Sequence, residues 1–141
     1  MIIAATAYPS YQEYVRKTRR IDMQANMLKI ASDIQRYKIA NFKVTGASAS
    51  DFGIKTTYPE QGVAFYNVTL EWFGEKAGEK DPVWQDTGKL GSERWRLVAT
   101  PISNTNQSND GFIILNSKGE RCWIKGMSAC EPSAITNWDG K

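Results

Sequence analysis

The first third of the chain carries apolar side chains at the spacing of an α-helix. The apolar positions are separated by four, three, four and three residues, and they are Met23, Met27, Ile30, Ile34 and Tyr37. Residues with this spacing lie on one face of a helix, and such a face packs on a protein core. Pro9 suits the first turn of a helix, and Gly46 suits the stop after its last turn. The pattern therefore predicts one long helix within residues 1–44, with Pro9 at its start.

After Gly46 the period of the apolar positions changes from that of a helix to that of a strand. Residues 45–62 are rich in Ser, Thr and Gly and are expected to form a connection. Apolar and polar residues then alternate along residues 63–73 and 94–100. The apolar positions of this alternation are Tyr66, Val68, Leu70 and Trp72, then Trp95, Leu97 and Ala99. Residues 111–116 and 121–124 predict two further strands, joined by a tight hairpin with Gly119 in the left-handed conformation.

These elements predict an α+β fold in which one long N-terminal helix packs on a four-stranded antiparallel β-sheet. The 141 residues are expected to form one domain, with the helix in 1–44, the connection in 45–62, the sheet in 63–125 and a tail in 126–141. A helix of about 36 residues is about 54 Å long, whereas the rest of the chain forms a body roughly 32 Å across. The N-terminal half of the helix must therefore project from the body or find another partner.

The composition argues against an enzyme. The chain has no histidine, which removes histidine-based catalytic dyads and histidine metal ligands. It has no glycine-rich phosphate loop and no G-x-S-x-G motif, and two cysteines cannot form a four-thiolate zinc site. We therefore expect no catalytic residue, no metal, no cofactor and no small-molecule substrate. A calcium site is a less favoured alternative, because turns explain its candidate residues, which are Asn104, Asn106, Asn109 and Asp110.

Positive charge is concentrated in the first part of the chain. Residues 1–44 hold eight basic and three acidic residues, a net charge of +5, whereas residues 45–141 hold ten basic and twelve acidic residues, a net charge of −2. A basic cluster is formed by Arg16, Lys17, Arg19 and Arg20. This cluster can contact another subunit or lipid headgroups, bind DNA phosphates, or form a solvated helix face. The subunit or headgroup contact is the favoured interpretation, and the absence of interleaved aromatic residues weakens single-stranded DNA binding in particular.

Residues 74–93 are a long polar segment between the first two predicted strands. Their glycine and charged residues predict a surface loop, inserted between the strands. Pro82 and Trp84 form an apolar point within it, which makes Trp84 a candidate anchor for a partner. A mobile insertion without function is the alternative. A loop tryptophan also often fixes its loop to its own body, and this applies equally to Trp138 in the tail.

Three segments of the chain resemble parts of one known family. The apolar-to-polar run IIAATAYPSYQEYV, from Ile2 to Val15, resembles the middle of the N-terminal helix of type IV pilins. The segments Trp95–Pro101 and Asp110–Trp123 are similar to the sheet of PilE-like minor pilins, and both segments occur in the order and spacing of that family. The resemblance implies the type IV pilin fold over most of the chain.

In this family the N-terminal helix has an apolar, membrane-spanning first half. The resemblance implies that this half is missing here, because the family's glycine-ended leader and early glutamate have no counterpart in the sequence. No processing residue is therefore assigned. The residues expected at the filament or subunit interface are Ile2, Ile3, Tyr8, Pro9, Tyr11, Tyr14, Val15, Arg16, Lys17, Arg19 and Arg20.

The resemblance implies a structural subunit, a minor pilin near the tip of a bacterial pilus. Such a subunit primes assembly and supports twitching motility, adhesion and DNA uptake. Its expected partners are other major and minor pilins, the inner membrane through the missing helix half, and DNA or a host surface. It is expected in the inner membrane before assembly and in the extracellular pilus afterwards. The alternatives are a minor pseudopilin of a type II secretion system and a pilus-associated DNA-binding receptor.

The compartment that the resemblance implies also bears on the cysteines. Cys122 and Cys130 are the only two in the chain. Disulfides persist in the periplasm and outside the cell, so we expect a bridge between them that ties the tail to the last strand.

Overall fold

The computed structural model describes residues 3–140, with side chains from Pro9 onward. Its longest element is the helix α1, Ile3–Asn41. The expected start at Pro9 is wrong, since Pro9 lies inside the helix. A proline removes a single helical hydrogen bond, and residues before it can still be helical. The helix ends before the expected stop at Gly46, because Phe42 already has a left-handed φ of 66°.

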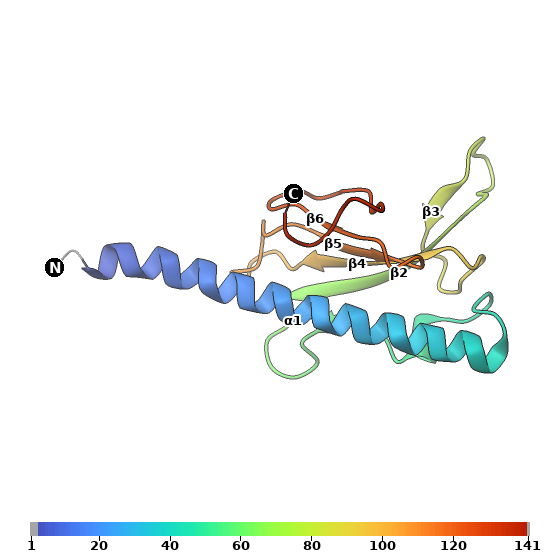
Figure 1. Ribbon diagram of the computed structural model, residues 1–141, viewed down its shortest axis with the longest axis horizontal. Coiled ribbons are helices and arrows are strands. Elements are labelled where there is room, and N and C mark those ends of the chain that lie inside the picture. Colours follow the sequence, from blue (N-terminus) through green and yellow to red (C-terminus); the bar gives the residue numbers. More distant parts are fainter. Residues whose placement is uncertain (1–2, 141) are drawn as a thin grey trace.

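The rest of the chain forms one antiparallel sheet beside a short 3-10 helix, η1. The bounds are η1 Ala49–Phe52, β1 Thr57–Tyr58, β2 Tyr66–Gly74, β3 Val83–Gln85, β4 Trp95–Pro101, β5 Ile113–Asn116 and β6 Arg121–Trp123. The strand order is β1-β2-β4-β5-β6, with β3 paired to the end of β2 (Figure 1). The sheet thus has six strands instead of the expected four. The two additional strands, β1 and β3, contain two and three residues, too few to show an alternation.

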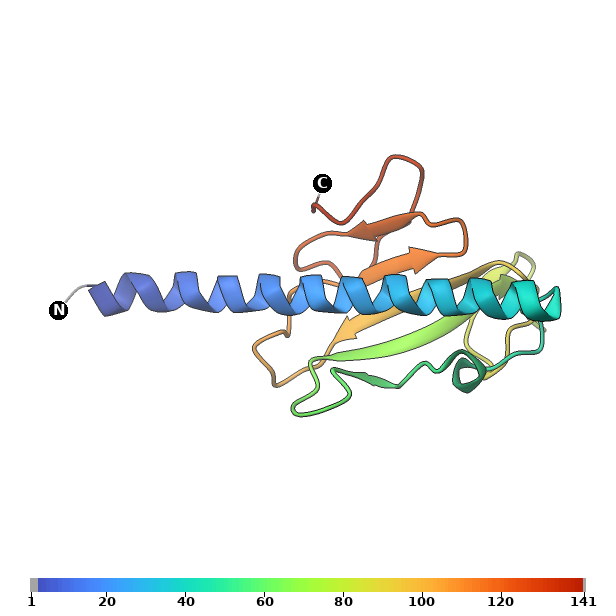
Figure 2. The same ribbon diagram turned by 60° about the horizontal axis from the view of Figure 1, so that its bottom comes forward.

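One face of the sheet packs on α1, as the two periodicities predict. Figure 2 shows the helix running across the front of the sheet. Met27 and Ile34 on the helix and Leu97 and Ile113 on the sheet are all completely buried in the resulting core. The opposite, outer face has a small second cluster around Val98, which joins the disulfide region to the sheet. The predicted hairpin between β5 and β6 is confirmed, with Gly119 at a φ of 80°.

The segment 74–93 is more ordered than expected. Its first part extends β2 and returns as β3, and Figure 1 shows this arm rising out of the sheet, away from α1. Its last part is core, because Leu90 is 3% exposed and exchanges backbone hydrogen bonds with Gly46 and Ala47. The interpretation of the whole segment as a surface loop is therefore wrong. Leu90 was missed because a single apolar residue in a polar segment has no periodicity.

The predicted disulfide between Cys122 and Cys130 is confirmed. It connects β6 to the tail, and Cys122 is buried against Val98 and Ile114 on the outer face of the sheet. The tail then returns across the sheet edge, where the Trp138 indole N–H donates to the Ile114 carbonyl at 3.3 Å. The tail thus has two anchors, one covalent and one formed by packing.

Replacing both cysteines with serine is expected to lower the free energy of unfolding by about 2.5 kcal/mol, because the bridge closes a short loop in the unfolded chain. Urea unfolding followed by tryptophan fluorescence measures the loss. Dithiothreitol should destabilise the unmodified chain by a similar amount and leave the serine variant unchanged. Equal stability of the two proteins under non-reducing conditions would show that the bridge does not stabilise the fold.

Candidate functional site

The helix is fixed to the body by a buried polar network, which we call the latch and which consists of Arg20, Tyr66, Gln107 and Asp110. Arg20 Nη1 donates to both carboxylate oxygens of Asp110, at 2.8 and 2.9 Å. The Gln107 amide nitrogen lies 2.8 Å from the Tyr66 hydroxyl and 3.1 Å from Asp110 Oδ2. The Asp110 side chain is completely buried and that of Arg20 is 12% exposed. The loop between β4 and β5 is therefore bound to the middle of α1.

The latch shifts the pKa values of two of its members. Burial raises the pKa of the Asp110 carboxyl above its ordinary value, although the hydrogen bond and charge of Arg20 act in the opposite direction. Burial also raises the pKa of the Tyr66 hydroxyl, and the negative charge of Asp110 raises it further. The latch is a structural ion pair. Asp110 neutralises the charge of Arg20, so this charge is not available to a binding partner.

Two more arginines of the basic cluster also contact the chain's own body. Arg16 Nε donates to the Asn106 carbonyl at 2.7 Å, and Arg16 Nη1 lies 2.7 Å from Glu13. The Arg19 guanidinium lies 3.8 Å from the centre of the Phe65 ring. The hydrogen bonds of Lys125 and Arg16 hold the pKa of the Glu13 carboxyl below its ordinary value. Most of the basic cluster therefore connects the helix to the body. Lys17 is its exposed member.

The remaining residues of the predicted interface lie near the projecting end of α1. Tyr11 and Tyr14 are 63% and 68% exposed, Pro9 is exposed, and Val15 is half-buried. The backbone of Ile3 and Tyr8 is helical, and Ile2 lies outside the described residues. Their role at a subunit interface stays a prediction.

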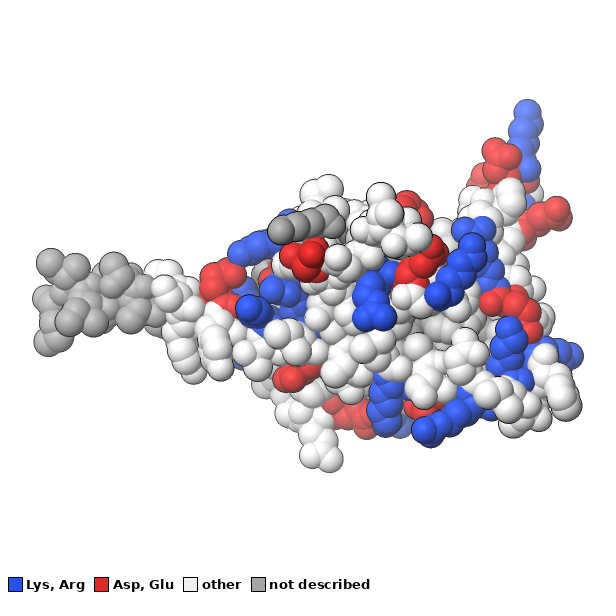
Figure 3. All heavy atoms as spheres, in the orientation of Figure 1, with Lys and Arg blue, Asp and Glu red and all other residues white. Residues whose placement is uncertain are grey.

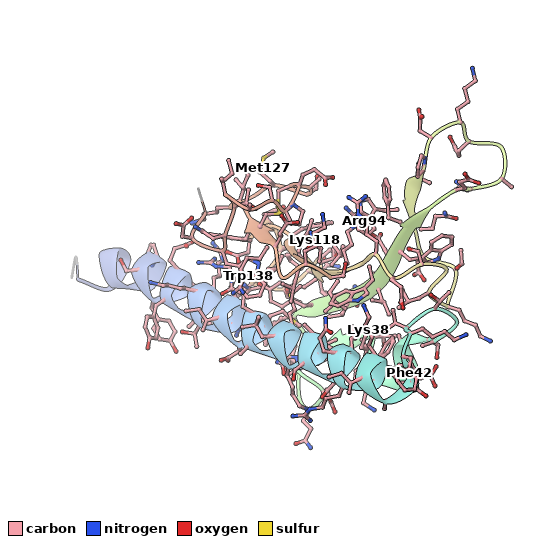
Figure 4. All side chains as sticks on the ribbon, turned by 45° about the vertical axis from the view of Figure 1, so that its right-hand side comes forward. Lys38, Phe42, Arg94, Lys118, Met127 and Trp138 are labelled. Atoms are coloured by element: carbon pink, nitrogen blue, oxygen red, sulfur yellow. A yellow bond between two sulfur atoms is a disulfide. The ribbon has the colours of Figure 1, made fainter. Side chains whose placement is uncertain are left out.

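A second charged group lies on the outer face of the sheet, and we call it the arginine–aromatic stack. Its members are Phe73, Trp84, Arg94 and Arg96. The register of β2 with β3 and β4 brings them together, since Phe73 pairs with Trp84 and Glu71 pairs with Arg96. The ring centroids of Phe73 and Trp84 are 5.2 Å apart. Figure 4 labels Arg94 at the base of the arm, and the β5–β6 hairpin that carries Lys118 adjoins it, because the Ser117 N–H donates to the Trp95 carbonyl at 2.9 Å.

The two guanidinium groups of the stack differ in their surroundings. Arg96 lies 4.4 Å from the Trp84 ring centre and forms ion pairs with Glu71 and Glu131. Arg94 lies 4.1 Å from the Phe73 ring centre and 5.5 Å from that of Trp84. Arg94 is exposed, and among residues 3–140 no carboxylate forms an ion pair with it. Its charge is held in place by two rings and faces solvent.

Sequence reasoning missed this group because Phe73, Trp84 and Arg96 lie on three different strands, with Arg94 directly before the last of them. The alternation that places Trp95 and Leu97 on the inner face also places Arg94 and Arg96 on the outer face. This alternation can be recognised in the sequence, but the contact of the two arginines with Phe73 and Trp84 cannot. Figure 3 shows Lys and Arg side chains at the base of the arm and near the C-terminal part of α1, with Asp and Glu side chains between them.

The predicted contact residues of the arm have separate environments. Trp84 is half-buried in β3 and packs on its own strand pair, whereas Pro82 is exposed at the entry to β3. Trp138 is also half-buried, with Arg121 4.8 Å from its ring centre. Both tryptophans fix their own segments, as the alternative interpretation predicts. A partner contact through Pro82 and Trp84 stays a prediction.

The polar turn considered for calcium is used within the protein. Asp110, its one carboxylate, is bonded to Arg20. Within the described part of the chain, no three potential acidic or cysteine ligands converge. No helix of residues 3–140 combines the length and apolar character needed to cross a bilayer.

Comparison with known proteins agrees with this architecture. A family model described as "Type IV minor pilin ComP, DNA uptake sequence receptor" matches residues 9–111. The crystal structure of the non-core minor pilin PilV from Neisseria meningitidis superposes with a TM-score of 0.55 at 18% sequence identity, and covers 85% of this chain and 96% of the PilV chain. No curated protein sequence matches.

The family match covers about three quarters of the chain, and the PilV structure has the same fold. The predicted resemblance is confirmed, as is the fold of one long helix on an antiparallel sheet. Pilins are not enzymes, and they are associated with the pilus and the membrane. The chain belongs to the family of ComP-like type IV minor pilins.

Proposed function

We propose that this minor pilin binds DNA during natural transformation and that the arginine–aromatic stack provides a contact with the DNA. The proposal follows the alternative of a DNA-binding receptor, because the matching family is described as a DNA uptake sequence receptor. The single observation that carries the location is Arg94, an exposed guanidinium that lies against Phe73 and is free of an acidic partner among the described residues.

The stack suits contact with a phosphate backbone. A guanidinium donates two parallel hydrogen bonds to a phosphate, and stacking on a ring reduces the entropy lost when it binds. The faces of Phe73 and Trp84 toward Arg94 are already covered, so they offer little surface for stacked bases. These features favour duplex DNA over single strands. The duplex would lie along the base of the arm, next to the β5–β6 hairpin that carries Lys118 (Figure 4).

Arg94→Ala is expected to weaken binding of a labelled duplex about tenfold and to lower the slope of log K against log salt by about one, because one phosphate contact is lost. Fluorescence anisotropy at several salt concentrations measures both. Arg94→Lys keeps the charge but loses the planar stacking, and an intermediate affinity is expected. A randomised duplex library, sequenced after capture, identifies any preferred sequence.

The matched control is Lys55→Ala. It removes the same charge from an exposed residue just before β1, which pairs with the other end of β2 from the arm. If both variants lose the same affinity, binding depends on net charge and the stack has no specific role. Duplex binding that survives Arg94→Ala but is lost in Lys17→Ala would assign the DNA to the helix.

The filament role remains part of the proposal. The chain would enter the pilus with its projecting helix among neighbouring pilins, near the tip, and thereby prime assembly and support twitching motility and adhesion. The projection of α1 beyond the body supports this placement (Figure 1). The alternative of a pseudopilin receives no support from the family match, which is to a type IV minor pilin.

A further inference from the structure

A small cleft lies between the middle of α1 and the loop that joins β1 to β2. In Figure 2 this loop, residues 59–65, lies beside the helix. The cleft has a volume of about 90 Å³. Its helix side carries three polar side chains of different character: the cation of Arg19, the anion of Asp22 and the amide of Asn26. None of these three residues belongs to the latch or to the arginine–aromatic stack.

The chain's own polar groups leave these three side chains unused. Among the side chains that the structure describes, none of the three has a hydrogen-bond or ion-pair partner, and Arg19 and Asp22 do not pair with each other. Arg19 Nη1 is buried as well, and a buried guanidinium nitrogen without an acceptor is destabilising. The other flank of the helix differs, since Arg16 and Arg20 both donate to the body. The flank that lines the cleft therefore has polar groups that a ligand can use.

The cleft also has an apolar surface, to which Met23, Tyr58 and Phe65 contribute. Met23 and Tyr58 are buried, and the Arg19 guanidinium lies 3.8 Å from the Phe65 ring centre, which restricts its position. At about 10–15 Å³ for each water-sized group, the cleft has room for roughly six to nine such groups. The size fits a small molecule with charged and apolar parts.

We propose that this cleft binds a free α-amino acid with a small apolar side chain, for which valine is the probe. The ligand's carboxylate accepts hydrogen bonds from the Arg19 guanidinium, and its ammonium group pairs with the Asp22 carboxylate. Residues three apart on a helix have Cβ atoms about 5–6 Å apart, so one small ligand reaches both. A ligand with a carboxylate alone would bring a second negative charge beside Asp22. The inference does not depend on DNA binding.

The methyl groups of the methionines provide the readout. The chain has four methionines, and NMR of the chain with carbon-13 in these methyl groups follows them separately. L-valine is expected to shift the Met23 signal in a saturable way, because Met23 lines the cleft. Met27 and Met127 do not line it and should not shift. Valinamide and N-acetylvaline each lack one of the two charges and should bind at least about tenfold more weakly.

Variants of the chain test the two charged contacts. Arg19→Met and Asp22→Asn are each expected to weaken L-valine binding at least about tenfold. The matched controls are Lys38→Met and Asp81→Asn, which remove the same charges from exposed residues outside the cleft and should have no effect. In Asp22→Asn the preference for L-valine over N-acetylvaline should disappear. Because Asp22 is exposed, this variant tests the proposal even if Arg19→Met unfolds.

Three results would overturn the proposal. Absence of a saturable Met23 shift with L-valine at tens of millimolar would show that the cleft is not an amino-acid site. Equal binding of L-valine and N-acetylvaline by the unmodified chain would assign the cleft to carboxylates in general, such as acidic side chains of another protein. Equal shifts of Met23 and Met127 would show a nonspecific effect of the ligand.

Discussion

Arg20→Ala is expected to lower the free energy of unfolding by about 3–5 kcal/mol at pH 7, the largest loss expected from any single polar side chain in this protein. The substitution leaves the Asp110 carboxylate charged, completely buried and without its cation. The cation–π contact between Arg20 and Trp123, at 3.8 Å, is lost at the same time. Chemical unfolding followed by circular dichroism measures the difference.

The pH dependence of this loss tests its cause. Burial raises the pKa of Asp110 in the folded protein, and removing Arg20 removes the group that opposes this rise. A carboxyl whose folded pKa is raised favours folding at low pH, and this contribution is lost as the pH rises through the folded pKa. The difference between Arg20→Ala and the unmodified chain should therefore shrink as the solution is acidified from neutral pH. A loss that is the same at all pH values would contradict the role of the carboxylate.

A double variant provides the control for the ion pair. Arg20→Met with Asp110→Asn removes both charges and keeps an amide next to Gln107. It should be more stable than Arg20→Ala alone, because no unpaired charge remains in the core. If the double variant is less stable than the single one, the loss comes from packing around Arg20 and not from the buried carboxylate.

Gly111→Ala is expected to destabilise the fold by about 3 kcal/mol, the sum of left-handed strain and overpacking. Gly111 has a φ of 102°, and a Cβ there would lie 2.4 Å from the Ile124 carbonyl oxygen and 2.9 Å from Trp123 Nε1. The first neighbour is backbone and cannot rotate away. Gly111 also follows Asp110, so the substitution is expected to disturb the latch.

Gly119→Ala is the matched control for this prediction. Gly119 has a φ of 80° and no heavy atom within 4 Å of an added Cβ. Its replacement should cost about 1 kcal/mol, from the left-handed conformation alone. Thermal unfolding of the two variants separates strain from overlap, and equal losses would show that the loop around Gly111 relaxes freely.

Much of the fold follows from local periodicity. The repeat from Met23 to Ile34 identifies the buried side of α1, because a helix turns its side chains at a constant angle. The alternation around Leu97 identifies the inner face of the sheet for the same reason. A strand of two or three residues is too short to show either pattern. The sequence therefore predicts neither β1 nor β3, and it predicts a loop where the structure has the arm.

The basic cluster shows where local reasoning fails. Arg20 lies three residues before Met23, so the helical repeat places it toward the body, but nothing near it in the sequence identifies its partner. Asp110 is 90 residues away, in a turn that the sequence describes only as polar. The fold brings them together and leaves Arg94 exposed instead. A charge count could indicate an interaction surface but could not say which arginines were free to form it.

The sequence by itself determined the helix-on-sheet architecture, the hairpin at Gly119, the bridge between two lone cysteines and the relation to minor pilins, since these depend on neighbours along the chain or on motifs. Only the tertiary structure decided which charges remain available. The register of β2 with β3 and β4 assembles the arginine–aromatic stack. Docking of the helix pairs Arg20 with Asp110 and leaves Ile21 and Ile39 exposed on its other side. These outcomes depend on contacts between distant segments, whose partners local patterns do not encode.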